Sequence, residues 1–392
     1  MADVVPRRVL PLIVLAQFAC TSPWFAVNAV MPDLQRELGW PASAVGTLTS
    51  AVQAGFIAGT LLFALLAVSD RFPPRRVFLG CALACAGCTL LALASVREFG
   101  GLLVWRTLTG FFLAGIYPVG MKIASQWYRQ GLGAALGWLI AALVLGSASP
   151  HLLRGLGAEL PWTHVMLAVA LLAASGGVML FVFVPDAPAP PAGPATLHWA
   201  ALAAVWTDRR LRASVLGYFG HMWELYTMWV LVPAILAARV AGALQSYAAF
   251  AVLGAGAICC VGGGLLARRF GSARVAQVQL AASGLCCVLA PWLIAAPALL
   301  FGLWLFVWGV TVAGDSPQFS ALTAANAPRS AVGSVLTLVN SIGFAISIVS
   351  IQCFVTLAEY WPLATLLPWL GLGPLLGLLA LRPLLRLRGE PA

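Results

Sequence analysis

The chain has 392 residues, of which 61% are hydrophobic and only 9% are charged, and its mean hydropathy is +0.96. A soluble domain carries about a quarter charged residues. So little polar surface cannot cover a globule in water, which excludes a soluble protein and predicts an integral membrane protein.

Apolar runs of about 20 residues, the length that crosses a hydrocarbon core of roughly 30 Å, recur along the whole chain. Each is expected to be a helix, because unpaired backbone is too costly in lipid and the alternating pattern of a membrane β-barrel is absent. The fold class is therefore predicted to be an all-α membrane protein with twelve transmembrane helices. The runs lie near residues 10–31, 43–66, 77–95, 101–126, 132–153, 163–184, 212–236, 244–266, 275–295, 298–322, 332–355 and 362–381.

The net charge of +10 comes from arginines that lie unevenly between the runs. With both termini placed in the cytoplasm, sixteen arginines fall in inner segments and four in outer loops. This bias follows the positive-inside rule. It favours a multi-pass protein of a bacterial-type inner membrane and argues against a nucleic-acid partner.

The nine cysteines all lie within apolar runs. The spacing of Cys85 and Cys88 matches a CxxC pattern, but no histidine or carboxylate adjoins it in the sequence. We expect no metal site, no redox chemistry and no cofactor. The first run is a full span without a cleavage site, so no separate signal peptide is expected.

A proline-rich stretch, "PDAPAPPAGPATLHW" at 185–199, separates the sixth and seventh runs. Its composition predicts a semi-rigid connector. The expected organisation is an N-terminal six-helix bundle over 1–184, a cytoplasmic linker over 185–211 and a C-terminal six-helix bundle over 212–392.

The two halves resemble each other in sequence. "WRTLTGFFLAGIYP" from Trp105 and "WLFVWGVTVAGDSP" from Trp304 align Trp, Gly, Gly and Pro at a constant offset of 199. Such duplication is typical of transporters that rock two bundles around a central site. The bundles are expected to be pseudo-symmetric.

The residues resemble the major facilitator superfamily (MFS). The loop "SDRFPPRR" is similar to the family's signature between spans two and three, although Leu66 replaces its leading glycine and one residue is inserted. Span four carries the arginine motif "RTLTGFFLAG", and span five, "GWLIAALVLGSASP", partly matches the glycine-proline motif of antiporters. The segment "YPVGMKIASQWYRQ" resembles the nitrate/nitrite and cyanate permease branches.

The resemblance implies a gating loop that latches the two halves through charges, the alternative being a solvated loop that only sets topology. Its expected residues are Asp70, Arg71, Arg75, Arg76, Arg268 and Arg269.

Five ionisable residues lie inside the spans: Arg106, Lys122, His221, Glu224 and Asp315. Such residues usually mark a substrate or proton path. At 1.5 Å per residue, Glu224 lies roughly 18 Å deep and Asp315 roughly 21 Å. We expect Glu224 to couple transport to protons, assisted by His221, Asp315 and Arg106. The alternative is that these groups only join helices. Lys122 either snorkels to the surface or lines the cavity.

In the family, spans one, four, seven and ten line the cavity, and their polar residues here follow helical spacing. The expected substrate-binding residues are Gln17, Trp24, Asn28, Tyr117, Lys122, Tyr218 and Gln318.

The predicted function is secondary active transport of a small polar or anionic solute, coupled to protons and acting as a monomer in the bilayer. A second interpretation is proton-driven efflux of amphipathic compounds. Copper transport and a non-transporting sensor remain further alternatives. No nucleophile elbow, phosphate loop or metal-ligand cluster supports an enzyme.

Overall fold

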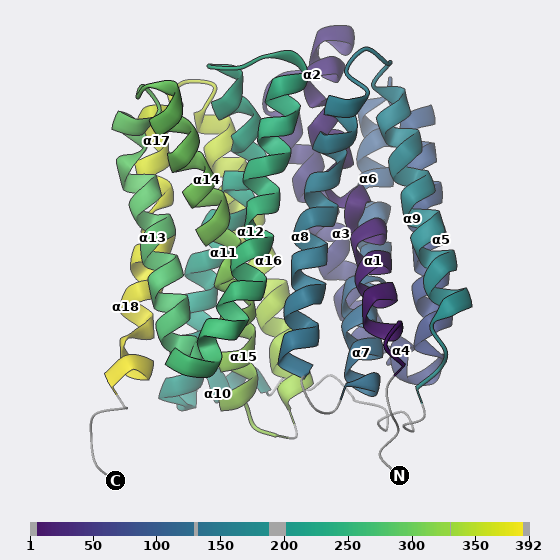
Figure 1. Ribbon diagram of the computed structural model, residues 1–392, viewed down its shortest axis with the longest axis vertical. Coiled ribbons are helices and arrows are strands. Elements are labelled where there is room, and N and C mark those ends of the chain that lie inside the picture. The colour runs from purple at the N-terminus through teal and green to yellow at the C-terminus, as the bar shows by residue number, and fades with distance from the viewer. Residues whose placement is uncertain (1–5, 129–131, 188–200, 330, 387–392) are drawn as a thin grey trace. The chain divides into compact units, whose positions relative to one another are not determined.

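The computed structural model describes residues 6–128, 132–187, 201–329 and 331–386, and these residues form helices without a strand. The chain divides into two compact units (Figure 1). The N-terminal unit comprises Met1–Thr196 and Val240–Phe250, and the C-terminal unit comprises Leu197–Arg239 and Ala251–Ala392.

The N-terminal unit holds the first six spans, with α1 packed on α8 and α9, and α3 packed on α6. Its helices are α1 (Val9–Thr21), the 3-10 helix η1 (Ser22–Phe25), α2 (Ala26–Leu38), α3 (Ala44–Leu65), α4 (Val68–Arg71), α5 (Pro74–Ala94), α6 (Phe99–Leu113), α7 (Tyr117–Trp127), α8 (Leu132–Leu156) and α9 (Thr163–Phe183).

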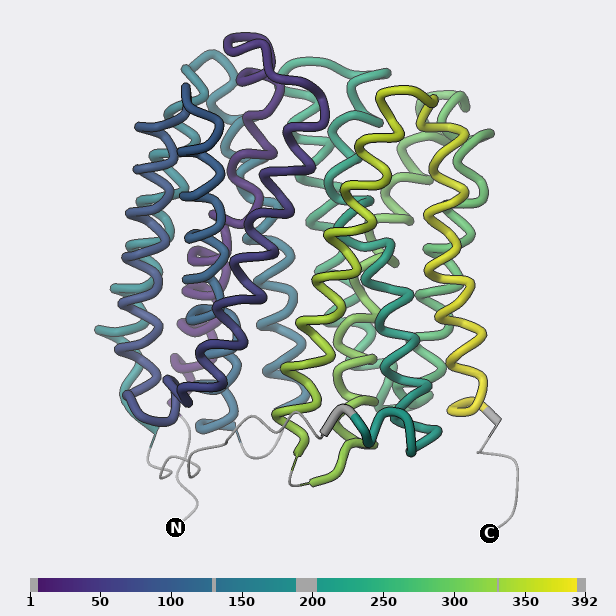
Figure 2. The backbone as a smooth tube through the Cα atoms, turned by 180° about the vertical axis from the view of Figure 1, so that it is seen from behind, coloured from purple at the N-terminus to yellow at the C-terminus, as the bar shows by residue number. Residues whose placement is uncertain are grey.

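The C-terminal unit centres on α11, which packs on α16 and α18, with α18 on the near side in the reverse view of Figure 2. Its helices are α10 (Ala201–Thr207), α11 (Arg209–Ala237), α13 (Ser272–Leu293), α14 (Ala298–Gly314), α15 (Ser316–Asn326), α16 (Val332–Leu357), α17 (Leu363–Leu370) and α18 (Leu372–Arg386). Helix α12 (Gly242–Phe270) begins in the residues grouped with the N-terminal unit and continues in this one.

The predicted spans correspond to these helices. Among the described residues, eleven helices are long and apolar enough to cross a membrane, counting α1 to α2, α6 to α7, α14 to α15 and α17 to α18 as one span each. The twelfth predicted span is α11, which has 29 residues but is less apolar because it carries His221 and Glu224. The predicted all-α membrane class is confirmed.

The connector between the halves lies largely outside the described residues, since 188–200 are not among them. The rest of the predicted linker does not lack structure, because its last residues form α10 and the first turn of α11. Asp208 caps α11 by accepting from the backbone N–H groups of Arg210 and Leu211. The division at 184 and 212 remains a prediction.

Four spans are interrupted where the sequence predicted continuous helices, the twelfth of them at Gly371 between α17 and α18. Span one changes to the 3-10 helix η1 around Pro23, span four breaks between α6 and α7, and span ten breaks between α14 and α15. Pro118 and Pro317 lie at the start of α7 and α15. A proline cannot donate a helix hydrogen bond, so it fits the first turn of a new helix and disrupts a continuous one.

Equivalent glycines let helices approach closely in both units. A Cβ on Gly110 of α6 would lie 1.8 Å from the carbonyl oxygen of Val52 on α3. A Cβ on Gly309 of α14 would lie 2.0 Å from the carbonyl oxygen of Val252 on α12. The two glycines align at the offset of 199 found in the sequence, so the repeat corresponds to a shared helix crossing.

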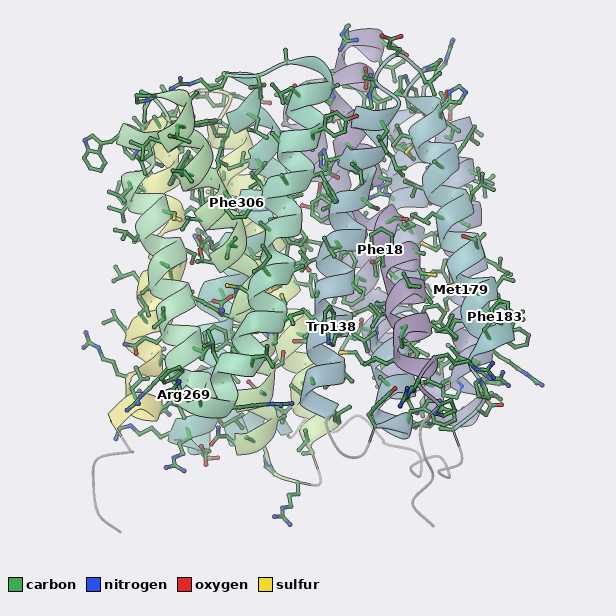
Figure 3. All side chains as sticks on the ribbon, viewed as in Figure 1. Phe18, Trp138, Met179, Phe183, Arg269 and Phe306 are labelled. Carbon is green, nitrogen blue, oxygen red and sulfur yellow. The ribbon has the colours of Figure 1, made fainter. Side chains whose placement is uncertain are left out.

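The outer faces of both units are apolar. Phe183 at the end of α9 and Phe306 on α14 are 54% and 43% exposed, and Figure 3 shows how they project from their helices. Leu171 and Leu299 are exposed in the same way. Large apolar side chains exposed along whole helices match a surface that faces lipid.

The loop between spans two and three contains one strained residue. Ala67, just before α4, has a φ of 48°, in the left-handed region that disfavours side chains with a Cβ. Ala67→Gly is expected to stabilise the fold by about 1 kcal/mol, read as a higher melting temperature in detergent. Ala64→Gly, inside α3, serves as the matched control and should lower it. A lower melting temperature for Ala67→Gly would contradict the strained turn.

Candidate functional site

In the N-terminal unit, Arg106 on α6 is fully buried and reaches the interruption in span one. Its guanidinium donates to the carbonyl oxygens of Pro23, at 2.8 Å, and Trp24, at 2.5 Å. These carbonyls belong to η1, where the Pro23 carbonyl also accepts from the backbone N–H of Ala26 in the 3-10 pattern. Arg106 therefore holds span four to the break in span one.

The charge of Arg106 is not neutralised by an acid in the part of the chain that the structure describes. Its hydrogen-bond partners are neutral carbonyls, and its buried Nε–H has no hydrogen-bond acceptor among the described residues. Among the described residues, Arg106 therefore joins two helices through backbone carbonyls and not through a salt bridge.

Span one also places a polar amide inside this unit. Gln17 is fully buried, and neither its oxygen nor its nitrogen has a hydrogen-bond partner among the described residues. Its oxygen lies close to Gly120 of α7, where an added Cβ would come within 2.2 Å. Buried amides normally pair, so Gln17 has unused capacity for a polar group of a ligand or for water.

The other predicted binding residues of this unit have mainly structural surroundings. Asn28 on α2 donates to the hydroxyl of Thr49 on α3 at 2.8 Å. Trp24 is buried with its ring 4.9 Å from that of Phe56. Tyr117 begins α7 and is half-buried. Their roles in binding remain predictions.

Lys122 on α7 pairs with the gating loop. Its ammonium donates to the Asp70 carboxylate in a very short contact and to the Ser69 carbonyl at 2.6 Å. Both side chains are partly buried, at 21% and 14% exposure. The ammonium is thus occupied by the loop, so the role of Lys122 in binding a solute rests on the sequence alone.

The remaining basic residues of the loop divide into two groups. Arg75 forms a bidentate ion pair with Asp186, at 2.7 and 2.6 Å, and caps α9 by donating to the carbonyl of Val184. Arg71 and Arg76 are exposed. The corresponding Arg268 and Arg269 on α12 are exposed too, and Figure 3 labels Arg269. The predicted latch between halves remains a prediction.

In the C-terminal unit, Glu224 on α11 lies in a pocket of neutral donors. Its carboxylate is 1% exposed. Oε1 accepts from the Trp308 indole at 2.7 Å and from the Cys287 thiol at 3.2 Å, and Oε2 accepts from the Ser283 hydroxyl at 2.9 Å. The donors come from α13 and α14, so the carboxylate joins three helices.

One turn away, a second buried acid meets a histidine. Nδ1 of His221 lies 2.8 Å from Oδ1 of Asp315, and the two side chains are 1% and 0% exposed. Asp315 stands between α14 and α15, at the break in span ten, where the amino end of α15 favours a negative charge. His221 lies beside the rings of Tyr218, at 5.9 Å, and Phe319, at 6.2 Å.

Near this pair, two amides line the same region. The nitrogens of Gln279 on α13 and Gln318 on α15 both come close to Gly263 of α12, where a Cβ would lie 2.9 and 3.5 Å from them. The oxygen of Gln279 has no hydrogen-bond partner among the described residues. The unit thus concentrates two carboxylates, a histidine and two amides in its interior.

The sequence-family model of the Major Facilitator Superfamily matches residues 13–351 of the chain. The chain belongs to this superfamily. It is 31% identical over 284 residues to the chloramphenicol resistance protein of Streptomyces lividans, covering 70% of each chain. It is 25% identical over 236 residues to the uncharacterized MFS-type transporter YybF of Bacillus subtilis, covering 59% of this chain and 53% of that one.

The fold of this MFS transporter matches a solved member. The human organic anion transporter MFSD10 (TETRAN) superposes with a TM-score of 0.73 at 18% identity, covering 96% of this chain and 99% of that one. The family and this structural relative are transporters and not enzymes, as the sequence predicted. The resemblance to the nitrate/nitrite and cyanate branches is not confirmed and stays a prediction.

The donors that surround Glu224 in this MFS chain were not predicted from the sequence. Ser283 and Cys287 are four residues apart in span nine, a spacing that puts them on one helix face. That spacing in an apolar span was the available signal. The family resemblance implies that spans one, four, seven and ten line the cavity, so no functional residue was expected in span nine.

The copper alternative is not tested by the structure. Within the residues described, no three histidine, cysteine, aspartate or glutamate side chains come together as metal ligands. The Cys287 thiol donates a hydrogen bond to Glu224.

The geometry of Arg106 makes a prediction about stability. Arg106→Lys replaces the planar guanidinium, which donates from two nitrogens, by a single compact ammonium that should fit the carbonyls of Pro23 and Trp24 less well, at a cost of about 2 kcal/mol. The expected result is a lower melting temperature in detergent. Arg97→Lys, at an exposed position, is the control and should change little. Equal melting temperatures for the two variants would contradict the bridging role.

Proposed function

We propose that this MFS transporter exports small, uncharged amphipathic compounds in exchange for protons, by alternating access between its two bundles. The observation that carries the proposal is Glu224, a buried carboxylate whose partners are neutral donors. The arginine bias between the spans supports an inner-membrane protein with both termini in the cytoplasm.

The surroundings of Glu224 suit a group that changes its charge. Among the described residues, no lysine or arginine pairs with it, so no cation fixes it in the ionised state. Binding one proton removes a buried charge without breaking an ion pair. A conformational equilibrium that favours one charge state can then be driven by the proton gradient.

The hydrogen-bond partners of Lys122 and Arg106 argue against an anionic solute. Lys122 is already paired with Asp70, and Arg106 is occupied by the carbonyls of Pro23 and Trp24. The similarity to a protein named for chloramphenicol resistance supports an uncharged aromatic solute. A transporter that confers resistance has to move the compound outward, and the antiporter-like motif in span five agrees with that direction.

Groups that suit such a solute are present in span one. Gln17 offers both an acceptor and donors that no described residue uses, and Trp24 lies two turns further along the chain. An amide and an aromatic ring match a molecule with polar substituents on an apolar body.

A small organic anion is the second candidate, and one observation favours it. Arg106 is buried without an acid among the described residues, and its Nε–H is unused. A bound anion would supply the missing negative charge. Competition by organic anions against chloramphenicol flux would distinguish the two solute classes.

Glu224→Gln is the decisive variant. Because the amide can accept from Trp308 and donate to Ser283, we expect the fold to be kept while the titrating group is lost. In proteoliposomes with an imposed pH gradient, the wild type should accumulate labelled chloramphenicol, and the variant should lose the gradient-driven part while retaining exchange without a gradient.

Glu98→Gln, at an exposed position before α6, is the matched control and should behave as the wild type. Full gradient-driven accumulation in Glu224→Gln would rule out Glu224 as the coupling group. No chloramphenicol flux in the wild type would rule out this solute.

A further inference from the structure

Ser283 on α13 stands between two possible acceptors. Its side chain is fully buried, and its hydroxyl oxygen lies 2.9 Å from Oε2 of Glu224 and 3.2 Å from the carbonyl oxygen of Leu280 in its own helix. A hydroxyl has one hydrogen to donate and two lone pairs with which to accept. At any moment Ser283 can donate to only one of these oxygens.

The two oxygens of Glu224 differ in the partners they have. Oε1 accepts from the Trp308 indole at 2.7 Å and from the Cys287 thiol at 3.2 Å. An indole N–H is a donor only and cannot accept a hydrogen. A proton placed on Oε1 would therefore displace a donor. Oε2 has Ser283 as its hydrogen-bonding partner, and a hydroxyl can reverse its role.

We propose that Ser283 is a positioning residue that fixes Oε2 as the atom of Glu224 that is protonated and stabilises both of its charge states. This inference rests on the proposed role of Glu224 as the proton-binding group. In the ionised state, Ser283 donates to Oε2. When one proton from water binds Oε2, the new O–H donates to the Ser283 oxygen, and the Ser283 hydrogen turns to the Leu280 carbonyl.

The proposed step leaves no buried polar atom of this group unpaired. One O–H bond forms on Oε2, no covalent bond of Ser283 breaks, and the Trp308 and Cys287 hydrogen bonds to Oε1 are kept. Buried polar groups without partners are costly. Rotation of the Ser283 hydroxyl thus lets a proton bind to and leave Oε2 of Glu224 without repacking of α11, α13 and α14.

Other titratable groups surround this pair. On α13 they are Cys286 and Cys287, on α11 His221, and between α14 and α15 Asp315, which is itself paired with His221. Helices α16 and α18 also pack on α11. Their described titratable side chains are the exposed Cys353 and the basic Arg382 near the end of α18, and neither pairs with Glu224.

Infrared difference spectroscopy on the purified, reconstituted protein tests the inference without a substrate. The carboxylic C=O band that appears as the pH is lowered, and that is missing in Glu224→Gln, belongs to Glu224. In Ser283→Ala the acid O–H loses its acceptor, so this band is expected to move to higher wavenumber. Ser283→Thr keeps the hydroxyl and should restore the wild-type position.

Ser341→Ala is the matched control, because Ser341 is a buried serine of the same unit that donates to the Thr337 carbonyl of its own helix. It should leave the Glu224 band unchanged. If Ser283→Ala does not fold, Ser283→Cys replaces it, and the weaker acceptor should give a smaller shift in the same direction.

An unshifted Glu224 band in Ser283→Ala or Ser283→Cys would overturn the inference, as would a wild type that shows no Glu224 band at any pH at which the protein stays folded. These outcomes are separate from those of the transport assay. A normal band and shift without proton-driven chloramphenicol flux would leave the role of Ser283 intact and contradict the proposed function.

Discussion

The cost of a buried charge governs the interior of both units. An ion placed in an apolar medium without compensation is highly unfavourable, so each buried ionisable group needs partners within reach. Arg106 finds them in the carbonyls of η1, and Glu224 finds them in three neutral donors. His221 and Asp315 lie side by side, with Nδ1 2.8 Å from Oδ1. The interruption in span one provides Arg106 with backbone acceptors, and the break in span ten places Asp315 at the amino end of α15.

The two halves carry their buried charges at positions that are not equivalent in the repeat, since Arg106 corresponds to Leu305 at the offset of 199. The offset of 199 that aligns Gly110 with Gly309 carries Glu224 onto Phe25, the last residue of η1. In the N-terminal unit this junction joins spans one and four through the cation of Arg106. In the C-terminal unit spans seven and ten are joined through the carboxyl group of Glu224 and the indole of Trp308. Both units thus join the same pair of corresponding spans, but with different residues at different positions.

Sequence patterns predicted the spans well because apolar length is a local property. They also singled out Arg106, Glu224 and Asp315, because an ionisable residue in an apolar run is visible without any structure. The partners were not predictable in the same way. Lys122 meets Asp70 and Arg75 meets Asp186, which lie 52 and 111 residues away in the chain. Helical spacing shows which residues share a face, but not which helix that face contacts.

The breaks in the spans were missed for a related reason. Pro118 and Pro317 were visible in the sequence, but they were used to align the two halves and not to end a helix. Ser283 and Cys287 were missed because single polar residues in span nine looked like ordinary small residues of a membrane helix. Their importance comes from Glu224 on another helix.

The central claim is that solute and proton binding are linked through a carboxylate in the C-terminal unit. Calorimetric titration of the purified protein with chloramphenicol, in buffers of different ionisation enthalpy, measures the protons exchanged on binding. We predict that about half a proton is released per molecule bound at the midpoint of the Glu224 titration, because half of the free protein carries the proton there. Binding whose heat is the same in every buffer, with no proton released, would contradict it.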